Sequence, residues 1–384
     1  MRDHRDLLTL ERGEKAVAAA DPDVADRRAA SGLANTWGAP HVRLRHAMRR
    51  YLAAMAATFV MTGVLVFGFN ALIDPLWYAG GNKLFARNFA FNERLAKTNL
   101  LLAAGAATYD CLVLGSSRVT LLDGGRVNGY RCFNYAFSAG HIGEFIAFAR
   151  YAKHRGLSPR LVIVGVDAEN FAERVAWNTD VPDFVSALAP SPSIWRSYLT
   201  LDAFLLSLRT SYNVSPLARY YDRQFVVDVL PERRAYQYLP GVVAAMVGGR
   251  YGERHVAQYR ALRAVFPDAR FIGFVPPVSA LVVARRRDAG SLDGLLDANY
   301  AARDAFDTLY DFSPPSETTS DRRNHYDDSH FLPEIYDRIA DGLNGDDAGF
   351  GLDLGTLSRA EYGRAYAEGL ARFGGAPTGA APSH

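Results

Sequence analysis

The sequence predicts a three-layer α/β/α sandwich around a central parallel sheet, preceded by one N-terminal transmembrane helix. The run from Tyr51 to Ile73 has no charged residue and no histidine. From residue 97 onward, short apolar runs bounded by turn residues alternate with stretches of helical periodicity. This alternation is typical of buried parallel strands joined by helices. Hydrophobic residues make up 49% of the chain, which is enough apolar mass for a sizeable core.

The apolar run has the length and the flanks of a membrane anchor. About 20 apolar residues can cross a bilayer as a helix, whereas a buried core helix would normally carry a polar stripe. A cleaved signal peptide is shorter and lies nearer residue 1. Four arginines precede the run: Arg43, Arg45, Arg49 and Arg50. Since positive flanks stay in the cytoplasm, we expect a single-pass protein of the bacterial inner membrane, with a cytoplasmic N-terminus and a periplasmic main domain.

The pattern divides the chain into five parts. These are a disordered cytoplasmic tail (1–42), a basic flank with the transmembrane helix (43–73), a linker (74–96), a main domain (97–347) and a C-terminal tail (348–384). Within the main domain, strands are expected at 111–114, 131–137, 161–166, 269–275 and 306–312, with helices at 142–155 and, as the last helix, from Pro333. An insertion at about 172–258 is rich in Trp and Tyr. We expect it to be mostly helical, with rings that either stack on sugars or pack a small core.

Charge and cysteine content argue against several kinds of function. The 43 Lys and Arg residues nearly balance 41 Asp and Glu, whereas a nucleic-acid surface needs clustered basic residues. The two cysteines, Cys111 and Cys132, form no zinc motif, and Asp167 with Glu169 offers too few ligands to indicate a metal. We therefore predict no nucleic-acid partner, no metal and no cofactor. The two cysteines fall in consecutive predicted strands and could pair if these strands are neighbours in the sheet. Because disulfide geometry is demanding, buried free thiols are the favoured interpretation.

One candidate reactive side chain follows the first predicted strand. The strand ends at Leu114, and the next residues, 115–118, read GSSR. Ligands of parallel sheets bind at the carboxyl ends of the strands. A serine there can lie at the opening of a helix, where backbone N–H groups face an incoming oxyanion. Ser117 is therefore a candidate nucleophile, although small residues after a strand are also ordinary turn chemistry.

A second candidate group lies just before the helix that is expected from Pro333. Residues 324–333 read NHYDDSHFLP and place Asp327 three positions before His330. A serine nucleophile needs a base, and the base needs an orienting carboxylate. This loop offers both. Taken alone, the same residues fit a solvated loop with a helix N-cap.

Together the two segments resemble the SGNH/GDSL hydrolase superfamily, in which the serine comes early and an Asp-x-x-His pair comes last. The resemblance implies the flavodoxin-like, three-layer form of the α/β/α sandwich. GSSR looks like a variant found in membrane-anchored bacterial members. The residues VPPVS at 275–279 are similar to a strand end in relatives of D-alanine transfer and polysaccharide acetylation proteins. The resemblance covers roughly residues 110–345, apart from the insertion.

The resemblance implies individual roles. Ser117 would be the nucleophile, His330 the base and Asp327 the residue that orients it. The backbone N–H groups of Ser117 and Gly140 would bind the oxyanion. Gly140 matches the second conserved block of the family through NYAFSAG at 134–140.

Two positions depart from the family pattern. Ser116 stands where the family usually has Asp. Asp167 takes the place of an Asn that donates to the oxyanion, and an ionised carboxylate cannot donate a hydrogen bond. Either Asn170 substitutes, Asp167 has another role, or the reaction is slow, since losing one oxyanion donor costs about 10²–10³ in rate. Arg118 either holds an anionic group of the substrate or pairs with Asp167 or Asp123 to order the loop.

These observations define the function hypotheses. The first is a membrane-anchored serine esterase or O-acyltransferase, with acetyl as the acyl group by resemblance, acting on extracytoplasmic polysaccharide or cell-envelope glycan. The second is a non-catalytic binding or assembly protein of a polysaccharide modification or export complex, partnered with a membrane acyltransferase or an export protein. The change at Asp167 favours this second hypothesis. A lipid or phosphoester hydrolase differs from the first hypothesis only in its substrate.

Overall fold

The computed structural model describes residues 38–374, apart from 86, 90–91, 174–179, 216–217, 223–224, 253–255 and 347–348. The chain divides into two units, Met1–Val64 and Leu65–His384. Most of the predicted cytoplasmic tail, and the end of the predicted C-terminal tail, fall outside the described residues.

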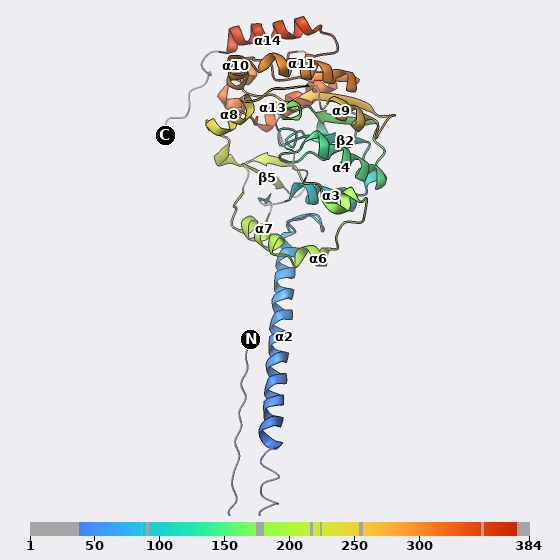
Figure 1. Ribbon diagram of the computed structural model, residues 1–384, viewed down its shortest axis with the longest axis vertical. Coiled ribbons are helices and arrows are strands. Elements are labelled where there is room, and N and C mark those ends of the chain that lie inside the picture. The colour runs from blue at the N-terminus through green and yellow to red at the C-terminus, as the bar shows by residue number, and fades with distance from the viewer. Residues whose placement is uncertain are drawn as a thin grey trace, which may run out of the picture. The chain divides into compact units, whose positions relative to one another are not determined.

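A central sheet of six strands organises the larger unit (Figure 1). Its order is β3 (Cys132–Asn134), β2 (Cys111–Leu114), β4 (Leu161–Gly165), β7 (Arg270–Val275), β8 (Thr308–Asp311) and β9 (Leu352–Asp353). The first five strands pair in parallel, and β9 pairs antiparallel with β8. The α/β class is therefore confirmed, with all five predicted strands present. The two-residue strand β9 is too short to leave a sequence pattern.

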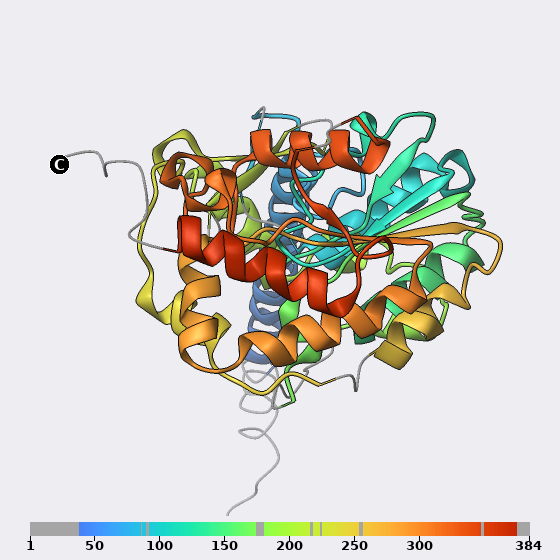
Figure 2. The ribbon, with the colours of Figure 1, turned by 90° about the horizontal axis from the view of Figure 1, so that it is seen from above.

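Both faces of the sheet are buried. All four residues of β2 are buried, and successive side chains of a strand point to opposite faces of the sheet. Leu112 and Leu114 of β2 belong to one apolar cluster, and Val113 belongs to the other. The first cluster includes side chains of α4 (Ile142–His154), α9 (Val256–Arg263), α10 (Ala280–Asp288), α11 (Leu292–Ala302) and α14 (Arg359–Phe373). The second includes those of α13 (Pro333–Asn344). Figure 2 shows the strands between helices on either side.

The insertion contains a hairpin that the sequence analysis missed. Its helices are short: α5 (Asp183–Ser186), α6 (Ile194–Tyr198), α7 (Leu201–Ser211) and α8 (Pro240–Val247). Between α7 and α8, β5 (Arg219–Asp222) and β6 (Val227–Val229) form a hairpin, and β1 (Arg87–Asn88) extends it into a three-stranded antiparallel sheet. The prediction of a mostly helical insertion is therefore incomplete. The hairpin carries Arg219 to the candidate site.

Two predicted boundaries are wrong. The expected linker, 74–96, contributes Trp77 and Glu93 to the interior, and α3 (Glu93–Ala104) already begins within it. The expected C-terminal tail contains α14, whose Tyr362 and Tyr366 are buried and donate to Oδ2 of Asp311 at 2.5 and 2.7 Å. Aromatic residues at helical spacing hold α14 in place, despite its many Ala and Gly neighbours. The helix that begins at Pro333 is therefore not the last.

The prediction of free cysteines is also wrong. Cys111 and Cys132 form a disulfide. They begin β2 and β3, which are parallel neighbours, and the register sets the two residues opposite each other. Spacing along the chain does not reveal this register, because it depends on how the two strands pair.

The N-terminal helix α2 (Gly38–Ile73) contains the predicted membrane segment. Residues Arg43–Ile73 are long and apolar enough to cross a membrane, and the most apolar stretch among them is not buried. A helix that leaves this much apolar surface uncovered is compatible with single-pass anchoring.

Candidate active site

The structure brings the three predicted catalytic side chains together. Ser117 follows the carboxyl end of β2, and His330 lies in the loop before α13. The Ser117 Oγ and His330 Nε2 atoms are 2.9 Å apart. On the other side of the ring, His330 Nδ1 lies 2.9 Å from Oδ2 of Asp327. Both distances are within hydrogen-bond reach, so the arrangement has the geometry of a Ser-His-Asp triad.

The loop that carries His330 is ordered by Asp327. Oδ1 of this carboxylate accepts the backbone N–H groups of Ser329 and His330, both at 2.7 Å. Burial raises the pKa of Asp327, but the hydrogen bond and charge of His330 and these N–H groups outweigh burial and lower it. The Tyr326 ring stacks on the imidazole, with centroids 5.5 Å apart. Asp327 is therefore ionised at neutral pH and fixes the orientation of the ring.

The next residue, Asp328, ties this loop to the end of β7. Its Oδ1 accepts from Ser279 Oγ at 2.7 Å, and its Oδ2 accepts from the Tyr236 hydroxyl at 3.0 Å. Ser279 closes the VPPVS segment and caps α10. This segment therefore contributes to the site by holding the histidine loop rather than by touching Ser117.

Arg118 is a structural clamp rather than an open anion site. Its Nε donates to Ser329 Oγ at 3.0 Å, and its Nη1 donates to Asp167 at 2.9 Å. Both terminal nitrogens also contact Glu169, at 2.6 and 3.0 Å. The guanidinium is buried and links the nucleophile loop to the end of β4 and to the histidine loop. The predicted pairing with Asp167 is present.

The two carboxylates that face Arg118 have opposite pKa shifts. Burial raises the pKa of Asp167 to about 6, with Arg118 opposing and Glu169 adding to the rise. Burial also acts on Glu169, but the charge and hydrogen bonds of Arg118 outweigh it and lower the pKa of Glu169 to about 2. Asp167 thus has the role of an acceptor for Arg118, which accounts for a carboxylate at this position.

The predicted oxyanion donors are only partly available. The Gly140 N–H donates to the Phe137 carbonyl at 3.0 Å. Asn170 donates from Nδ2 to the Tyr259 hydroxyl at 2.8 Å and accepts the Ile142 N–H at 3.1 Å, so it holds the start of α4. The single Gly140 N–H is therefore engaged within its own turn, whereas the Asn170 amide uses one of its two N–H groups for Tyr259. The substitution of Asn170 as an oxyanion donor stays one of the alternatives. The Ser117 N–H has no hydrogen-bond partner among the described residues, and it stays a candidate donor.

Arg219 is a site residue that the sequence analysis missed. From β5, its Nη1 donates to the Ser117 carbonyl at 2.8 Å and to the Thr120 hydroxyl, and its Nη2 donates to Ser138 Oγ at 2.8 Å. The side chain is buried. It therefore joins the nucleophile loop to the loop after β3. The insertion has no recognisable motif, so the sequence does not indicate that this arginine contacts the candidate site.

A buried network of charges supports Arg219. Oε1 of Glu93 accepts from the Tyr221 hydroxyl at 2.7 Å, and Oε2 accepts the Ser138 N–H. Burial raises the pKa of Glu93, but the charges of Arg219 and Lys97 outweigh it, so the net shift is downward. Burial also lowers the pKa of Lys97 to about 7, with Arg219 adding to this shift and Glu93 opposing it.

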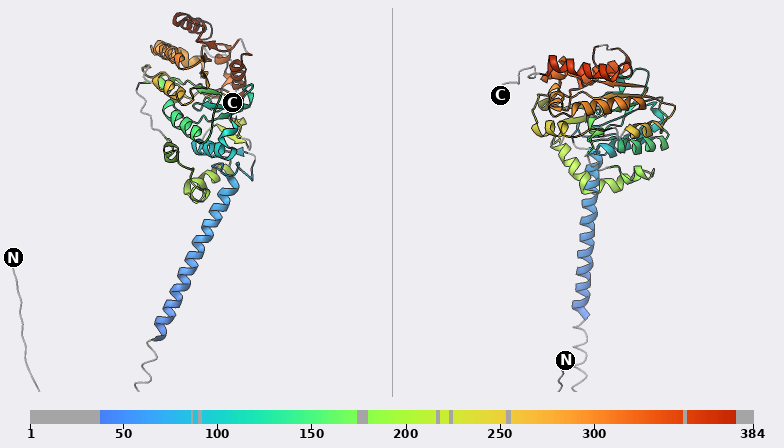
Figure 3. Two further views of the ribbon diagram at one scale, coloured as in Figure 1. Left: turned by 90° about the vertical axis from the view of Figure 1, so that its right-hand side faces the viewer. Right: turned by 45° about the horizontal axis from the view of Figure 1, so that its top comes forward.

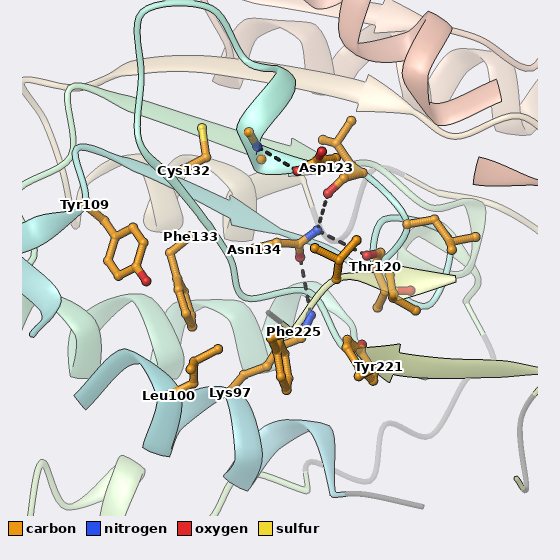
Figure 4. A pocket seen from close by; sticks show the side chains of 16 residues that line it. Lys97, Leu100, Tyr109, Thr120, Asp123, Cys132, Phe133, Asn134, Tyr221 and Phe225 are labelled. Carbon is orange, nitrogen blue, oxygen red and sulfur yellow. Dashed lines mark hydrogen bonds between the residues drawn. The ribbon is translucent and has the colours of Figure 1, made fainter. Parts of the chain in front are cut away.

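Lys97 and Tyr221 of this network also line a cavity of 160 Å³ (Figure 4). Lys97 and Asn134 point toward each other at its wall, with Nζ and Oδ1 3.5 Å apart. Asn134 also donates to the carbonyls of Val119 and Leu122, at 3.0 and 2.8 Å. It therefore holds the turn that follows the nucleophile, and Ser117 is not among the residues lining this cavity.

Two larger cavities meet at the Ser117–His330 pair. One, of 540 Å³, extends beneath the insertion and is lined in part by Arg219, Arg233 and Leu239. The other, of 360 Å³, is lined in part by Gly140 and His141. Ser117 and His330 line both. The Ser117 side chain thus borders open space on two sides.

A scan against protein-family models and a search of curated proteins found no match for this chain. Within the described part of the chain, no group of three or more His, Cys, Asp or Glu residues is arranged to hold a metal ion. A function for this chain is therefore inferred from the α/β fold and from the geometry of the site.

Proposed function

We propose that this protein is a membrane-anchored serine esterase or O-acyltransferase of the SGNH type. The observation that carries the proposal is the 2.9 Å contact between Ser117 Oγ and His330 Nε2, with Asp327 behind the ring. The parallel sheet with helices on both faces, with the serine after β2, supports the SGNH assignment and its three-layer architecture.

The mechanism follows from the roles of the three side chains. His330 takes the proton from Ser117 Oγ as this oxygen attacks an ester carbonyl. The Ser117 N–H stabilises the oxyanion, and His330 gives its proton to the departing alcohol. Water or a sugar hydroxyl then attacks the acyl-serine, with His330 again accepting and returning a proton. Ser117 is restored, and the acyl group leaves as a carboxylic acid or as a new ester.

The substrate is proposed to be a polysaccharide or cell-envelope glycan outside the cytoplasm, with acetyl as the acyl group. The disulfide between Cys111 and Cys132 supports an oxidising compartment such as the periplasm. The arginines before the apolar run of α2 support a cytoplasmic N-terminus in the bacterial inner membrane. The cavity of 540 Å³ beside Ser117 is large enough for a sugar unit.

The activity is tested with the full chain in detergent, using nitrophenyl acetate and O-acetylated oligosaccharides as substrates. We expect acetate release to fall on the order of 10⁴-fold in Ser117→Ala. The matched control is Ser186→Ala, an exposed serine of α5, which should keep the wild-type rate. Equal rates in wild type and Ser117→Ala would contradict the proposal.

A second candidate function is a non-catalytic binding or assembly role in a polysaccharide modification or export complex, beside a membrane acyltransferase or export protein. The specific observation in its favour is that the only N–H group of the Gly140 backbone donates to the Phe137 carbonyl rather than facing an oxyanion site. In a deletion strain, full complementation by both Ser117→Ala and His330→Ala would favour this second function. Loss of complementation by either variant would favour the enzyme.

A further inference from the structure

The last turns of α2 are surrounded by a surface that contains none of the candidate active-site residues. The helices α6 and α7 lie beside residues 65–73 of α2 (Figures 1 and 3). Phe67 stacks on Trp195 with ring centroids 4.1 Å apart, and Phe69 meets Phe204 edge-on at 5.8 Å. The two short helices are therefore packed against the end of the apolar run.

A hydrogen-bonded turn after α2 fixes this packing. Asn70 donates from Nδ2 to the Tyr198 carbonyl at 2.8 Å, and the Tyr198 hydroxyl donates to Asp74. The buried Asp74 carboxylate also accepts three backbone N–H groups from residues 78–81, at 2.6–2.9 Å. The end of α2 and the helix α6 are therefore held together by side-chain hydrogen bonds.

The helix α7 has the reverse of the usual burial pattern. It buries Ala203, Ser207 and Thr210 and exposes Leu201 and Leu205. A helix that faces water on its outer side normally shows the opposite distribution. Ala203 belongs to the apolar cluster against which Phe67 and Ala71 of α2 pack, and the Thr210 hydroxyl donates to Asn88 of β1. The leucines on the outer side favour an apolar solvent.

Five exposed side chains of this region form what we call the apolar collar. Its members are 41–76% exposed: Trp195, Leu199, Leu201, Leu205 and Tyr212. All five lie on α6, on α7 or directly after one of these helices. Several large exposed apolar residues on neighbouring elements indicate an interaction surface. Trp and Tyr are the aromatic residues that favour the membrane interface.

The length of the apolar run determines where the apolar collar would lie relative to the lipid bilayer. Counting about 20 residues from Tyr51 for a bilayer crossing reaches Asn70. Residues 51–65, at about 1.5 Å each, extend only about 22 Å, whereas the hydrocarbon core is about 30 Å thick. Phe67 and Phe69 must therefore lie at membrane depth, and α6 and α7 cover those two residues.

We propose that the apolar collar inserts into the outer interface of the lipid bilayer and fixes the domain against the membrane surface. The proposal rests on the membrane anchoring in the proposed function. The occupant is lipid because Trp195 of the apolar collar stacks on Phe67, a residue of the helix that is proposed to span the membrane. The exposed Arg196 and Arg209 lie beside the leucines, where their long side chains can reach phosphate headgroups. One exposed acid, Asp202, lies on the same helix.

The test uses the full chain in liposomes. Because the only two cysteines of the sequence form a disulfide, single new cysteines can carry an environment-sensitive fluorophore. The collar variants are Leu201→Cys and Leu205→Cys. The references are Val60→Cys, within the membrane run, and Arg323→Cys, whose side chain is 82% exposed near the histidine loop. Quenching is measured with lipids brominated on the acyl chain near the headgroup and with a water-soluble quencher.

The collar probes should be quenched by brominated lipid several-fold more than the Arg323 probe, because interfacial apolar faces sit about 5–10 Å into the boundary region. Quenching of both collar probes by the aqueous reagent alone, as at Arg323, would overturn the proposal. Protection from both quenchers would overturn it as well, because it would indicate a protein contact such as a second copy. Failure of anchoring is distinguishable, since the Val60 probe would then also escape lipid quenching.

Discussion

At the scale of single residues, the site depends on the hydrogen bond by which Asp327 orients the His330 ring. Asp327 accepts from the His330 ring and from two backbone N–H groups, so its replacement changes both the ring tautomer and the loop. We expect Asp327→Asn to lower the rate of acetyl ester hydrolysis by about 10³–10⁴-fold. The measurement is kcat with nitrophenyl acetate. An unchanged kcat would show that the carboxylate does not orient the base.

Arg219 is predicted to act through the nucleophile loop. Arg219→Gln removes a charged donor from the Ser117 carbonyl, and hydrogen bonds to charged groups contribute about 1.5–3 kcal/mol. We expect kcat to fall about tenfold to 100-fold, with KM nearly unchanged. The control is Arg234→Gln, which removes an arginine from the same insertion that pairs with Asp228 and Glu334. Equal loss in both variants would indicate general destabilisation of the insertion.

Lys97 gives the site region a predictable pH dependence. With a pKa of about 7 in the folded protein and 10.5 as its ordinary value, Lys97 binds more protons in the unfolded chain between these values. Its contribution to the free energy of unfolding therefore rises with pH from about 7 to 10, by at most about 1.4 kcal/mol per unit. We expect the thermal midpoint of wild type to gain on that of Lys97→Met over this range. A constant difference would contradict the shifted pKa.

At the scale of elements, the disulfide and the site occupy opposite ends of the strands. Cys111 and Cys132 begin β2 and β3, whereas Ser117 follows the end of β2. Closing a loop of this size stabilises a protein by about 3 kcal/mol in the chain-entropy model. We expect the double variant Cys111→Ala with Cys132→Ala to lose about this much free energy of unfolding and to keep its kcat at 25 °C. Lost activity with unchanged stability would contradict this separation.

The sequence could predict residues that lie in local patterns, but not those that are brought together by packing. Ser117, Asp327 and His330 each belong to a local sequence pattern, a strand end or a loop before a helix. Neither pattern is specific alone, and the roles are implied by the resemblance of the two together to the SGNH/GDSL superfamily. Arg219 and Glu93 meet Ser138 only through the packing of an insertion, which has no periodic signal. The orientation of the Gly140 N–H depends on its own backbone turn. The disulfide depends on the register of β2 and β3, which places Cys111 opposite Cys132. A register is set by how two strands pair, and the sequence of either strand alone does not reveal it.

At the scale of the whole molecule, the arginines that precede the apolar run within α2 are predicted to set the orientation of this helix. A reporter enzyme that is active only in the periplasm, fused after the last residue, should be active in cells. Replacing Arg43, Arg45, Arg49 and Arg50 by Ala should lower this activity, because positively charged flanks resist translocation. Activity of a cytoplasm-only reporter at the same position would contradict the proposed topology.

The central claim is that Ser117 is a nucleophile activated by His330, and covalent trapping tests it most directly. The membrane-embedded full chain is treated with a fluorophosphonate and digested, and the modified peptide is identified by mass spectrometry. We expect one adduct on Ser117 in the wild type, formed more slowly by orders of magnitude in His330→Ala and absent in Ser117→Ala. No adduct on wild type, or equal labelling of wild type and Ser117→Ala, would contradict it.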